Sequence, residues 1–303
     1  MKVQTITEQL LFSTVRIETD QGVGTGFLLQ AQIQFGGSFI FLITNKHVVK
    51  DVSTIKFFFT KGKEVISIEK DKKKIKVFSK KREEQTKEMI PHTGERYECQ
   101  LNGQEWFDHP DSDIDLTLIN LSPILNKIHK EDKIFIKTIP LELIPSKETI
   151  EELDALENVL FIGYPSGIYD KKNLLPIIRR GITATPIYSD YEGKPIFLID
   201  ASVFKGSSGS PVFVYDKGSF KTRDGTTHIG DRIFFCGVIS DTIIKKESGK
   251  IEFIEVPTKI LPILETGQMI DLGIVIKSEK VKELLDLYLD NLNKENREKN
   301  KNE

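Results

Sequence analysis

Residues 204–213 read FKGSSGSPVF, a run of small residues that leads directly into an apolar strand. Glycine lets a backbone turn sharply and expose its amide groups, because it adopts dihedral angles that other residues avoid. A serine held in such a turn is accessible to a substrate, which makes Ser208 a candidate nucleophile. A simple hairpin turn is the alternative, and this segment taken alone favours the hairpin. The rest of the sequence decides between the two.

Short strands flank this turn on both sides along the chain. Residues 13–19 (STVRIET), 38–49 (SFIFLITNKHVV), 158–165 (NVLFIGYP) and 232–240 (RIFFCGVIS) are rich in β-branched and aromatic residues. Glycine or charged turns separate these segments, as expected for strands. Many short strands of this kind are typical of β-barrels or a β-sandwich. We therefore expect an all-β fold for most of the chain.

The C-terminal segment has a different pattern. Residues 278–303 place valine and leucine at helical spacing, with Ser278 as a candidate N-cap. Only polar residues follow Leu292. The sequence predicts a helix that packs on the β structure and ends in a polar tail.

Composition argues against several classes of function. The chain has 303 residues and a formal net charge of −2, so no strong attraction to nucleic acid or to an anionic membrane is expected. Residues 61–88 carry eleven Lys or Arg against six Asp or Glu. They lack a set of stacking aromatics, so a solvated hairpin is favoured over a nucleic-acid site. No cofactor or metal-ligand motif appears, and neither a cofactor nor a metal is expected.

Cysteine usage and the N-terminal residues indicate the compartment. Cys99 and Cys236 are the only cysteines, which is too few for a disulfide framework. One bridge between them is the alternative to two buried free thiols, and free thiols in a reducing compartment are favoured. Residues 1–18 contain no apolar signal region, and no run approaches the roughly 18 apolar residues of a membrane span. We expect a soluble cytoplasmic protein.

A serine nucleophile needs a base, because a free alcohol is almost entirely protonated at neutral pH. Of the five histidines, His47 alone follows directly on an apolar strand, although a structural histidine is the alternative there. The attacked carbonyl also becomes an oxyanion that needs preorganised donors. The amides of Gly206 and Ser208 lie two residues apart in a tight turn and are candidates for these donors.

A third group must orient the histidine and stabilise its cation. The segment 112–121 (SDIDLTLINL) places Asp113 and Asp115 at the start of an apolar strand. A carboxylate in such a place is usually a solvated turn residue. Asp115 directly precedes the apolar run, so it is favoured over Asp113 as the group that is drawn inward.

Three motifs follow each other in the order His, Asp, Ser: TNKHV (44–48), DLTLI (115–119) and GSSGSP (206–211). Together they resemble the signature of chymotrypsin-like serine proteases. The chain looks most similar to bacterial trypsin-like peptidases, including those of the HtrA type, but without a PDZ domain. The resemblance covers about residues 10–290.

The resemblance implies two antiparallel six-stranded β-barrels with a C-terminal α-helix. It implies a trypsin-like peptidase domain at residues 1–276, with the N-terminal barrel at about 10–125 and the C-terminal barrel at about 155–276. Residues 277–303 would form the C-terminal helix and polar tail.

The resemblance also implies roles for single residues. Ser208 would be the nucleophile, His47 the general acid and base, and Asp115 the group that orients His47. The amides of Gly206 and Ser208 would form the oxyanion hole. Ser207 stands where secreted relatives carry an aspartate that pairs with a processed N-terminus, so activation by N-terminal trimming is not expected.

Five residues are implied to bind substrate. Ser202, six residues before the nucleophile, would lie at the base of the primary specificity pocket. Val238, Ile239 and Ser240 would pair with the substrate, and Gly273 would lie on the opposite wall. A buried cation needs a carboxylate partner, and Ser202 supplies none. Cleavage after small or medium uncharged residues is therefore expected, rather than after Lys or Arg.

The implied function is a serine endopeptidase that hydrolyses protein or peptide substrates through an acyl-enzyme. A regulatory protein partner is also expected, because an unrestrained cytoplasmic protease would digest its neighbours. The alternative is a protease-fold binding or sensor module that no longer cleaves. An esterase on another fold is disfavoured, because hydrolases with a G-x-S-x-G motif place the serine before the acid and the histidine.

Overall fold

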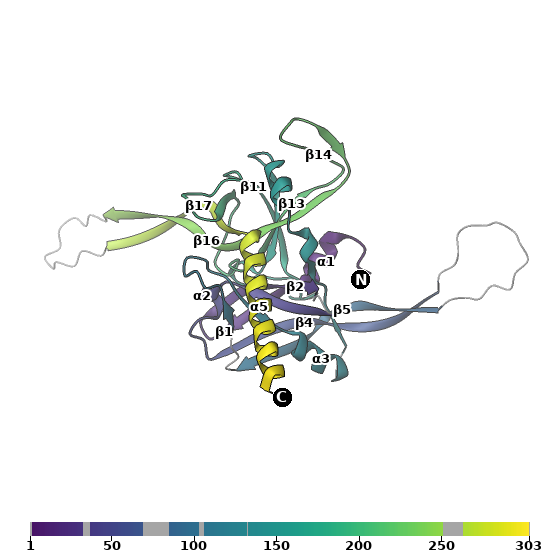
Figure 1. Ribbon diagram of the computed structural model, residues 1–303. Coiled ribbons are helices and arrows are strands. Elements are labelled where there is room, and N and C mark those ends of the chain that lie inside the picture. Colours follow the sequence, from purple (N-terminus) through teal and green to yellow (C-terminus); the bar gives the residue numbers. More distant parts are fainter. Residues whose placement is uncertain are drawn as a thin grey trace, which may run out of the picture.

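The computed structural model describes residues 2–32, 37–68, 85–102, 106–131, 133–250 and 263–302. Strands from the first half of the chain form one sheet, and strands from the second half form a closed barrel, which lies above the sheet in Figure 1. The helix α5 (Ser278–Asn302) follows the last strand of the barrel, and its Tyr288 ring packs against Phe41 of the sheet. The expected fold class, an all-β fold with a C-terminal helix, is confirmed, with a closed six-stranded barrel and a nine-stranded sheet in the places of the two expected six-stranded barrels.

The N-terminal sheet has nine strands in the described ranges: β1 (Thr14–Thr19), β2 (Gly22–Gln32), β3 (Ser38–Thr44), β4 (Thr54–Ile68), β5 (Gln85–Asn102), β6 (Phe107–Asp108), β7 (Thr117–Asn120), β8 (Ile134–Phe135) and β9 (Ile139–Pro140). The main path runs β5-β4-β1-β2-β3-β7-β6, with β8 on β4 and β9 on β2. The strand number exceeds the expected six because three two-residue segments, β6, β8 and β9, also bond to the sheet.

The C-terminal barrel has six strands, as expected: β10 (Asn158–Gly163), β11 (Ile177–Thr183), β12 (Ile196–Asp200), β13 (Pro211–Asp216), β16 (Arg232–Lys250) and β17 (Ile263–Lys277). They close in the order β10-β11-β12-β17-β16-β13. A separate hairpin, β14 (Ser219–Lys221) with β15 (Thr227–Ile229), extends from the barrel. Closure leaves the barrel without free edges, which makes it a rigid support for the loops at its rim.

Helices occupy the connections: α1 (Ile6–Ser13), α2 (Lys46–Val49), α3 (Ser122–Glu131) and α4 (Lys147–Glu151), with single turns η1 (Leu141–Leu143) and η2 (Pro165–Gly167). The predicted C-terminal helix is confirmed as α5, whereas α1 was not expected. Glu8 N donates to Thr5 Oγ1 at 3.2 Å, and Thr5 N donates to the Glu8 carboxylate at 3.0 Å. This reciprocal capping box fixes the start of α1.

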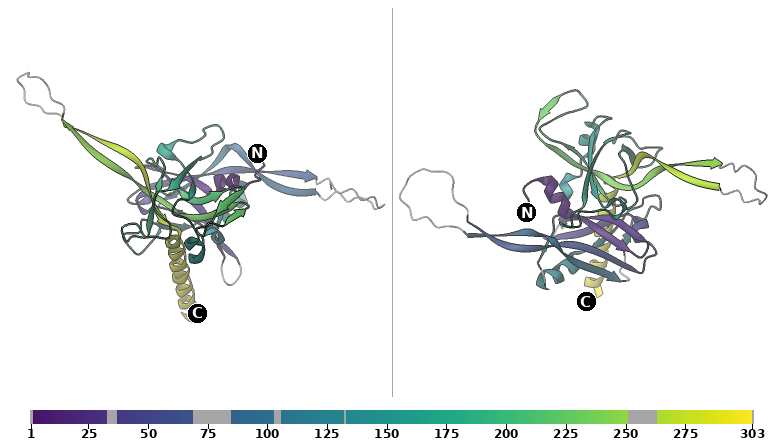
Figure 2. Two further views of the ribbon diagram at one scale, coloured as in Figure 1. Left: turned by 90° about the horizontal axis from the view of Figure 1, so that it is seen from above. Right: turned by 180° about the vertical axis from the view of Figure 1, so that it is seen from behind.

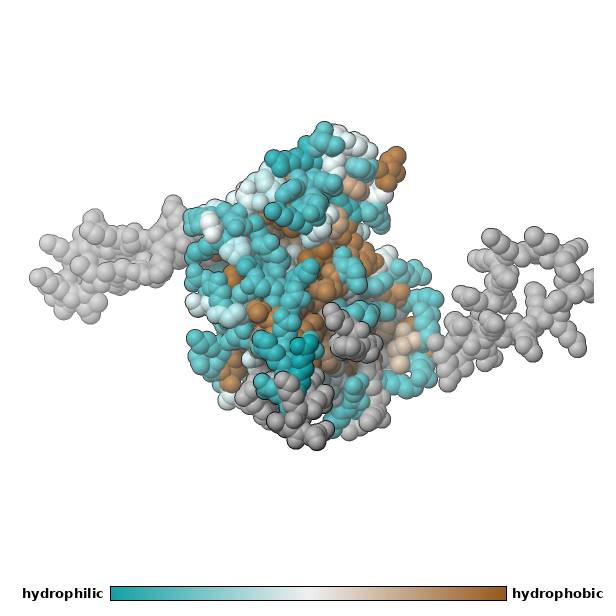
Figure 3. Space-filling model, in the orientation of Figure 1, coloured by the Kyte–Doolittle hydropathy of each residue, from teal (hydrophilic) through white to brown (hydrophobic). Residues whose placement is uncertain are grey.

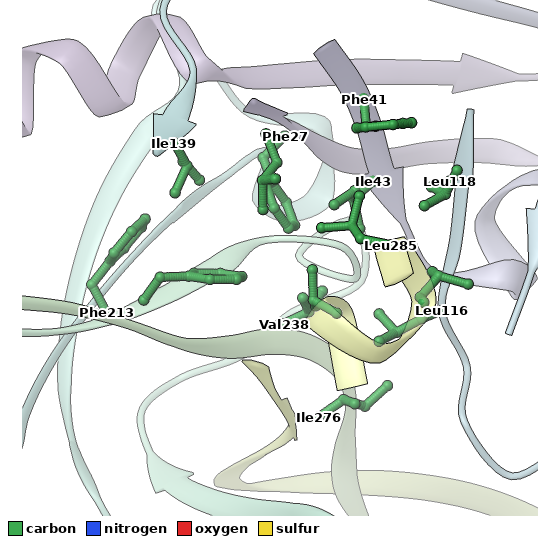
Figure 4. Packing of buried hydrophobic residues seen from close by; sticks show 14 of the residues in the cluster. Phe27, Phe41, Ile43, Leu116, Leu118, Ile139, Phe213, Val238, Ile276 and Leu285 are labelled. Atoms are coloured by element: carbon green, nitrogen blue, oxygen red, sulfur yellow. The ribbon is translucent and has the colours of Figure 1, made fainter. Parts of the chain in front are cut away.

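One hydrophobic core joins the sheet, the barrel and α5 (Figure 4). Phe27 of the sheet lies 5.3 Å, centroid to centroid, from Phe235 of the barrel. From α5, Leu284 and Leu285 are fully buried in the same cluster. Burying one such side chain contributes about 1.5–3 kcal/mol. The two β units are therefore held in a fixed relation, and any cleft between them has a defined shape.

One face of the molecule is mostly hydrophilic. Hydrophilic residues cover most of the face in Figure 3, and hydrophobic residues gather toward its middle. Two hairpins, β4–β5 and β16–β17, extend from opposite sides of the body (Figure 2). No helix within the described ranges is long and apolar enough to cross a membrane. The basic segment 61–88 lies mostly outside the described residues, so the absence of a nucleic-acid partner stays a prediction.

Cys99 and Cys236 are both free and both buried. Burial raises the pKa of Cys99 to about 11 and that of Cys236 to about 12. Since the thiolate is the reactive form, we expect almost no reaction with a thiol reagent at pH 8 in the native protein. After denaturation without reductant, two thiols should titrate, and one in the Cys99→Ser variant. A count near zero in the denatured wild type would show a disulfide instead.

Candidate active site

A cleft of about 300 Å³ lies where the N-terminal sheet meets the barrel. From the first half of the chain it is lined by Thr19, Gln21, Gly22, Val23, Gly24, His47 and Val48. From the second half it is lined by Val203, Phe204, Lys205, Gly206, Ser208, Asp241 and Thr242. The cleft thus brings together His47 and Ser208, which are 161 positions apart in the chain.

The pairing of β3 with β7 places His47 beside Asp115. Thr44, the last residue of β3, is the register partner of Thr117, the first residue of β7. His47 follows β3 in the short helix α2, and Asp115 precedes β7 by two residues. Asn45 Nδ2 donates to the backbone oxygen of Asp115 at 2.7 Å, which ties the two strand ends together.

The Asp115 carboxylate holds His47 through two hydrogen bonds. The backbone N of His47 donates to Oδ1 at 3.1 Å, and Nδ1 donates to Oδ2 at 2.5 Å. Ser240 Oγ donates to the same Oδ2 at 3.1 Å. With the proton on Nδ1, the Nε2 atom of the imidazole is left to accept a proton. The side chain of His47 is 52% exposed, so Nε2 can be reached from solvent.

The neighbouring aspartate is placed differently. Asp113 is exposed, and its backbone N donates to Asp111 Oδ1 at 2.9 Å. Among the described hydrogen bonds, none joins the Asp113 side chain to His47. Of the two candidates at the start of β7, only Asp115 contacts the imidazole.

The turn that carries Ser208 docks onto β2. Thr25 N donates to the backbone oxygen of Ser208 at 3.0 Å, and Thr25 Oγ1 donates to that of Gly206 at 2.8 Å. Gly206 and Gly209 have φ of +84° and +86°, which other residues rarely adopt. A Cβ at Gly209 would also lie 1.8 Å from the backbone oxygen of Thr25. The turn therefore needs glycine at both positions.

Two amides of this turn have no acceptor among the residues that the structure describes. Ser207 N donates to Phe204 O at 3.0 Å, and Gly209 N donates to Ile239 O at 2.8 Å. By contrast, in the described part of the chain no hydrogen bond is formed by Gly206 N or Ser208 N. Both amides are thus available to an oxygen atom bound in the cleft.

The side chains of His47 and Ser208 line the same cleft without a direct hydrogen bond between them in the described structure. A hydrogen bond between a serine and its base often becomes well aligned only when substrate binds. The arrangement provides a base, a hydroxyl and two free amides around one space.

None of the five predicted substrate-binding residues is among those that line the cleft. The Oγ of Ser240 donates to Asp115, as described above. Val238 and Ile239 are fully buried in the hydrophobic cores. Ile239 N also donates to Ser210 O at 2.9 Å, so this segment is already paired within the barrel. Ser202 and Gly273 are not among the residues that line the cleft.

The residues that directly follow Ser202 and Ser240 in the chain line the cleft. Val203 and Phe204 line the cleft directly after Ser202, and Asp241 and Thr242 line it directly after Ser240. The sequence contained a signal for the second pair, because the apolar strand becomes polar at this point. Within the described residues, no cluster of His, Cys, Asp and Glu is arranged to hold a metal ion.

The surroundings of His47 raise its pKa above the ordinary value. The hydrogen bond to Asp115 is the largest cause; burial opposes it, and the negative charges of Asp115 and Asp241 add to the rise. We therefore expect the imidazole to stay protonated to a higher pH than an ordinary histidine. Asp241→Asn should lower the pKa of His47, because one attractive charge is lost.

An NMR titration of the His47 imidazole measures this directly. Asp271→Asn is the matched control, because Asp271 lies on the adjacent strand β17 and does not line the cleft. A His47 pKa below that of a free histidine, or one unchanged in Asp241→Asn, would contradict the electrostatic account.

Comparison with known proteins gives one match in sequence. Residues 24–220 match the family described as trypsin-like peptidase domain, and this range contains His47, Asp115 and Ser208. No curated protein matches the chain.

Similar solved structures include an inactive form of Rv3671c from M. tuberculosis, with 14% identity over 91% of this chain and 86% of that chain and a TM-score of 0.43. An inactivated protease paralogue of the scabies mite has 15% identity over 93% and 96%, with a TM-score of 0.43. The thermostable serine protease AL20 from an extremophilic microorganism has 11% identity over 91% and 95%, with a TM-score of 0.40.

Proposed function

The chain belongs to the trypsin-like peptidase family, and from this premise we propose that it is a serine endopeptidase with His47, Asp115 and Ser208 as its catalytic groups. One observation carries the proposal. The Asp115 carboxylate binds both the backbone and Nδ1 of His47, while His47 and Ser208 line one cleft. A histidine fixed in this tautomer, lining one cleft with a serine in a glycine-rich turn, is suited to nucleophilic catalysis.

The reaction proceeds in two halves. Ser208 Oγ attacks the peptide carbonyl carbon, and its proton passes to Nε2 of His47. The carbonyl oxygen becomes an oxyanion that accepts hydrogen bonds from the amides of Gly206 and Ser208, and each such donor is worth about 10²–10³ in rate. The intermediate collapses, the C–N bond breaks, and the amine leaves with the proton from His47. Water then attacks the acyl-enzyme, with His47 again as base, and Ser208 is regenerated.

The chain's own groups supply every proton transfer in this scheme, so the proposal includes no metal or cofactor. The substrate is a protein or peptide that enters the cleft between the two β units. We assign residues 1–276 to the peptidase domain and residues 277–303 to the helix and tail. We also assign the protein to the cytoplasm, since both of its thiols are free. An unidentified regulatory protein partner remains part of the proposal.

A protease-fold binding module without activity is the second candidate. The observed contact between His47 and Asp115 weighs against it, because a module that only binds has no need of an oriented base. A proteome-wide cleavage assay separates the two. Wild type should create new N-termini that the Ser208→Ala variant does not create. Identical peptide patterns for both proteins would support the binding module and overturn the endopeptidase.

We expect cleavage after small or medium uncharged residues. Val203 and Phe204 give the cleft an apolar wall, and Lys205 adjoins it, so a cation held there would be desolvated beside a like charge. Each additional methylene changes selectivity by only about 1–3 kcal/mol, and the preference should be broad. Profiling with a peptide library checks this expectation. Dominant cleavage after Lys or Arg would contradict it.

A further inference from the structure

The substrate cleft contains an acidic side chain for which the catalytic scheme has no use. Asp241 lies on β16 immediately after Ser240, and it lines the cleft together with His47 and Ser208. It is exposed, and within the described part of the chain it forms no ion pair. A carboxylate with no cationic partner, beside the reacting groups, is available to a substrate.

The backbone around Asp241 fixes the position of this carboxylate. Thr242 N donates to Asp241 Oδ1 at 2.7 Å. Thr242 Oγ1 in turn donates to the backbone oxygen of Leu272 on β17 at 3.1 Å. The carboxylate is thus held against two hydrogen-bonded strands of the barrel, β16 and β17. When a partner binds, it loses less conformational freedom than a long, mobile side chain would.

The direction that Asp241 faces determines which substrate residue it meets. Asp241 lines the same cleft as His47, and its negative charge is among those that raise the pKa of His47. Val203 and Phe204 form the wall that we assign to the residue before the scissile bond. Successive side chains of an extended peptide point to opposite sides. We therefore assign the preceding substrate side chain, which points away from that wall, to the part of the cleft lined by His47 and Asp241.

We infer that Asp241 is a specificity-determining residue that selects a Lys or Arg side chain one residue before the uncharged residue at the cleavage site. The inference rests on the proposed endopeptidase function and names its substrate class. Lys205 also lines the cleft and adjoins Phe204. Its charge disfavours a cation at the apolar wall and leaves the position next to Asp241 as the favourable one for a positive side chain.

The expected preference for a cationic substrate residue is small, because its ion pair with Asp241 would be exposed to solvent. An exposed ion pair contributes up to about 1 kcal/mol, which corresponds to about fivefold in kcat/KM. A change of Asp241 to lysine replaces attraction by repulsion, so the ratio between cationic and acidic substrates should swing by roughly 25-fold or more. Both effects should weaken as salt is raised from low ionic strength, because exposed charges are screened.

The test uses a cut site found in the proteome-wide assay. Three peptides of this site are synthesised, which differ only in the residue directly before the one after which the enzyme cuts. That residue is Lys, Gln or Glu. The ratios of kcat/KM among the three peptides are measured for wild type, Asp241→Asn, Asp241→Lys and the control Asp271→Asn. Ratios within one enzyme cancel any uniform effect of the substitution on His47.

We expect Lys to exceed Gln by about fivefold in wild type and in Asp271→Asn, no preference in Asp241→Asn, and a preference for Glu in Asp241→Lys. Serine-dependent cleavage with equal rates for all three peptides in wild type would overturn the inference and leave the endopeptidase intact. A lysine preference that persists in Asp241→Asn would overturn it as well. If wild type cleaves no peptide, the proposed function fails, and this inference fails with it.

Discussion

Replacing Ser208 by alanine should lower kcat/KM by roughly 10⁴-fold or more, because the only atom that forms the acyl-enzyme is removed. The same loss is expected for His47→Ala, since the serine proton then has no acceptor. The double variant should be little worse than either single variant, because both groups act in one proton transfer. The measurement is kcat/KM for a common peptide substrate in the three variants.

Ser207→Ala is the matched control for this experiment. Ser207 lies in the same turn, is buried, and has no hydrogen-bond partner for its Oγ in the described structure. Its replacement should preserve most of the activity. Mild, additive losses in Ser208→Ala and His47→Ala would show that Ser208 is not the nucleophile.

Asp115→Asn should also be severe, on the order of 10⁴-fold in kcat, as in the well-studied triad of digestive proteases. An asparagine can place an N–H where the carboxylate now accepts the Nδ1 proton of His47, which favours the wrong tautomer. The loss of negative charge also removes the main support of the raised His47 pKa. We expect the fold to persist, because the side chain keeps its size.

Asp113→Asn serves as the matched control, since Asp113 is exposed and makes no contact with His47 in the described structure. Its activity should be close to that of wild type. If Asp113→Asn were the damaging change and Asp115→Asn the mild one, the assignment of the orienting carboxylate would be wrong by two residues.

The sequence predicted His47, Asp115 and Ser208 through a resemblance carried by three motifs in order, since each motif taken alone has a structural alternative. The neighbouring apolar segments predicted that His47 follows one strand and that Asp115 precedes another. The small residues around Ser208 predicted a tight turn. The pairing of β3 with β7 then brings the first two together. The hydrogen bonds from Thr25 to the turn had no local signal, because they join residues more than 180 positions apart.

The specificity residues were harder to place. The strand 232–240 has apolar residues facing both cores, with Val238 and Ile239 both fully buried. An alternation of apolar and polar residues would have shown which side faces the cleft, but this strand has none. The pairing of this segment with substrate stays a prediction, and the next two residues, Asp241 and Thr242, line the cleft.

Of the two terminal helices, α5 was predicted from the sequence and α1 was not. The spacing of leucines predicted α5 correctly. The capping box of Thr5 and Glu8 was a readable signal for α1 that the apolar pattern did not supply.

The central claim, that Ser208 is a nucleophile activated by His47, is tested most directly by covalent labelling. Wild type and His47→Ala are incubated with a fluorophosphonate, which reacts with activated serines, and the modified residue is located by peptide mapping. The account predicts one adduct, on Ser208, in wild type and none in His47→Ala over the same time. An adduct on another serine, equal labelling of both proteins, or no labelling of wild type would contradict it.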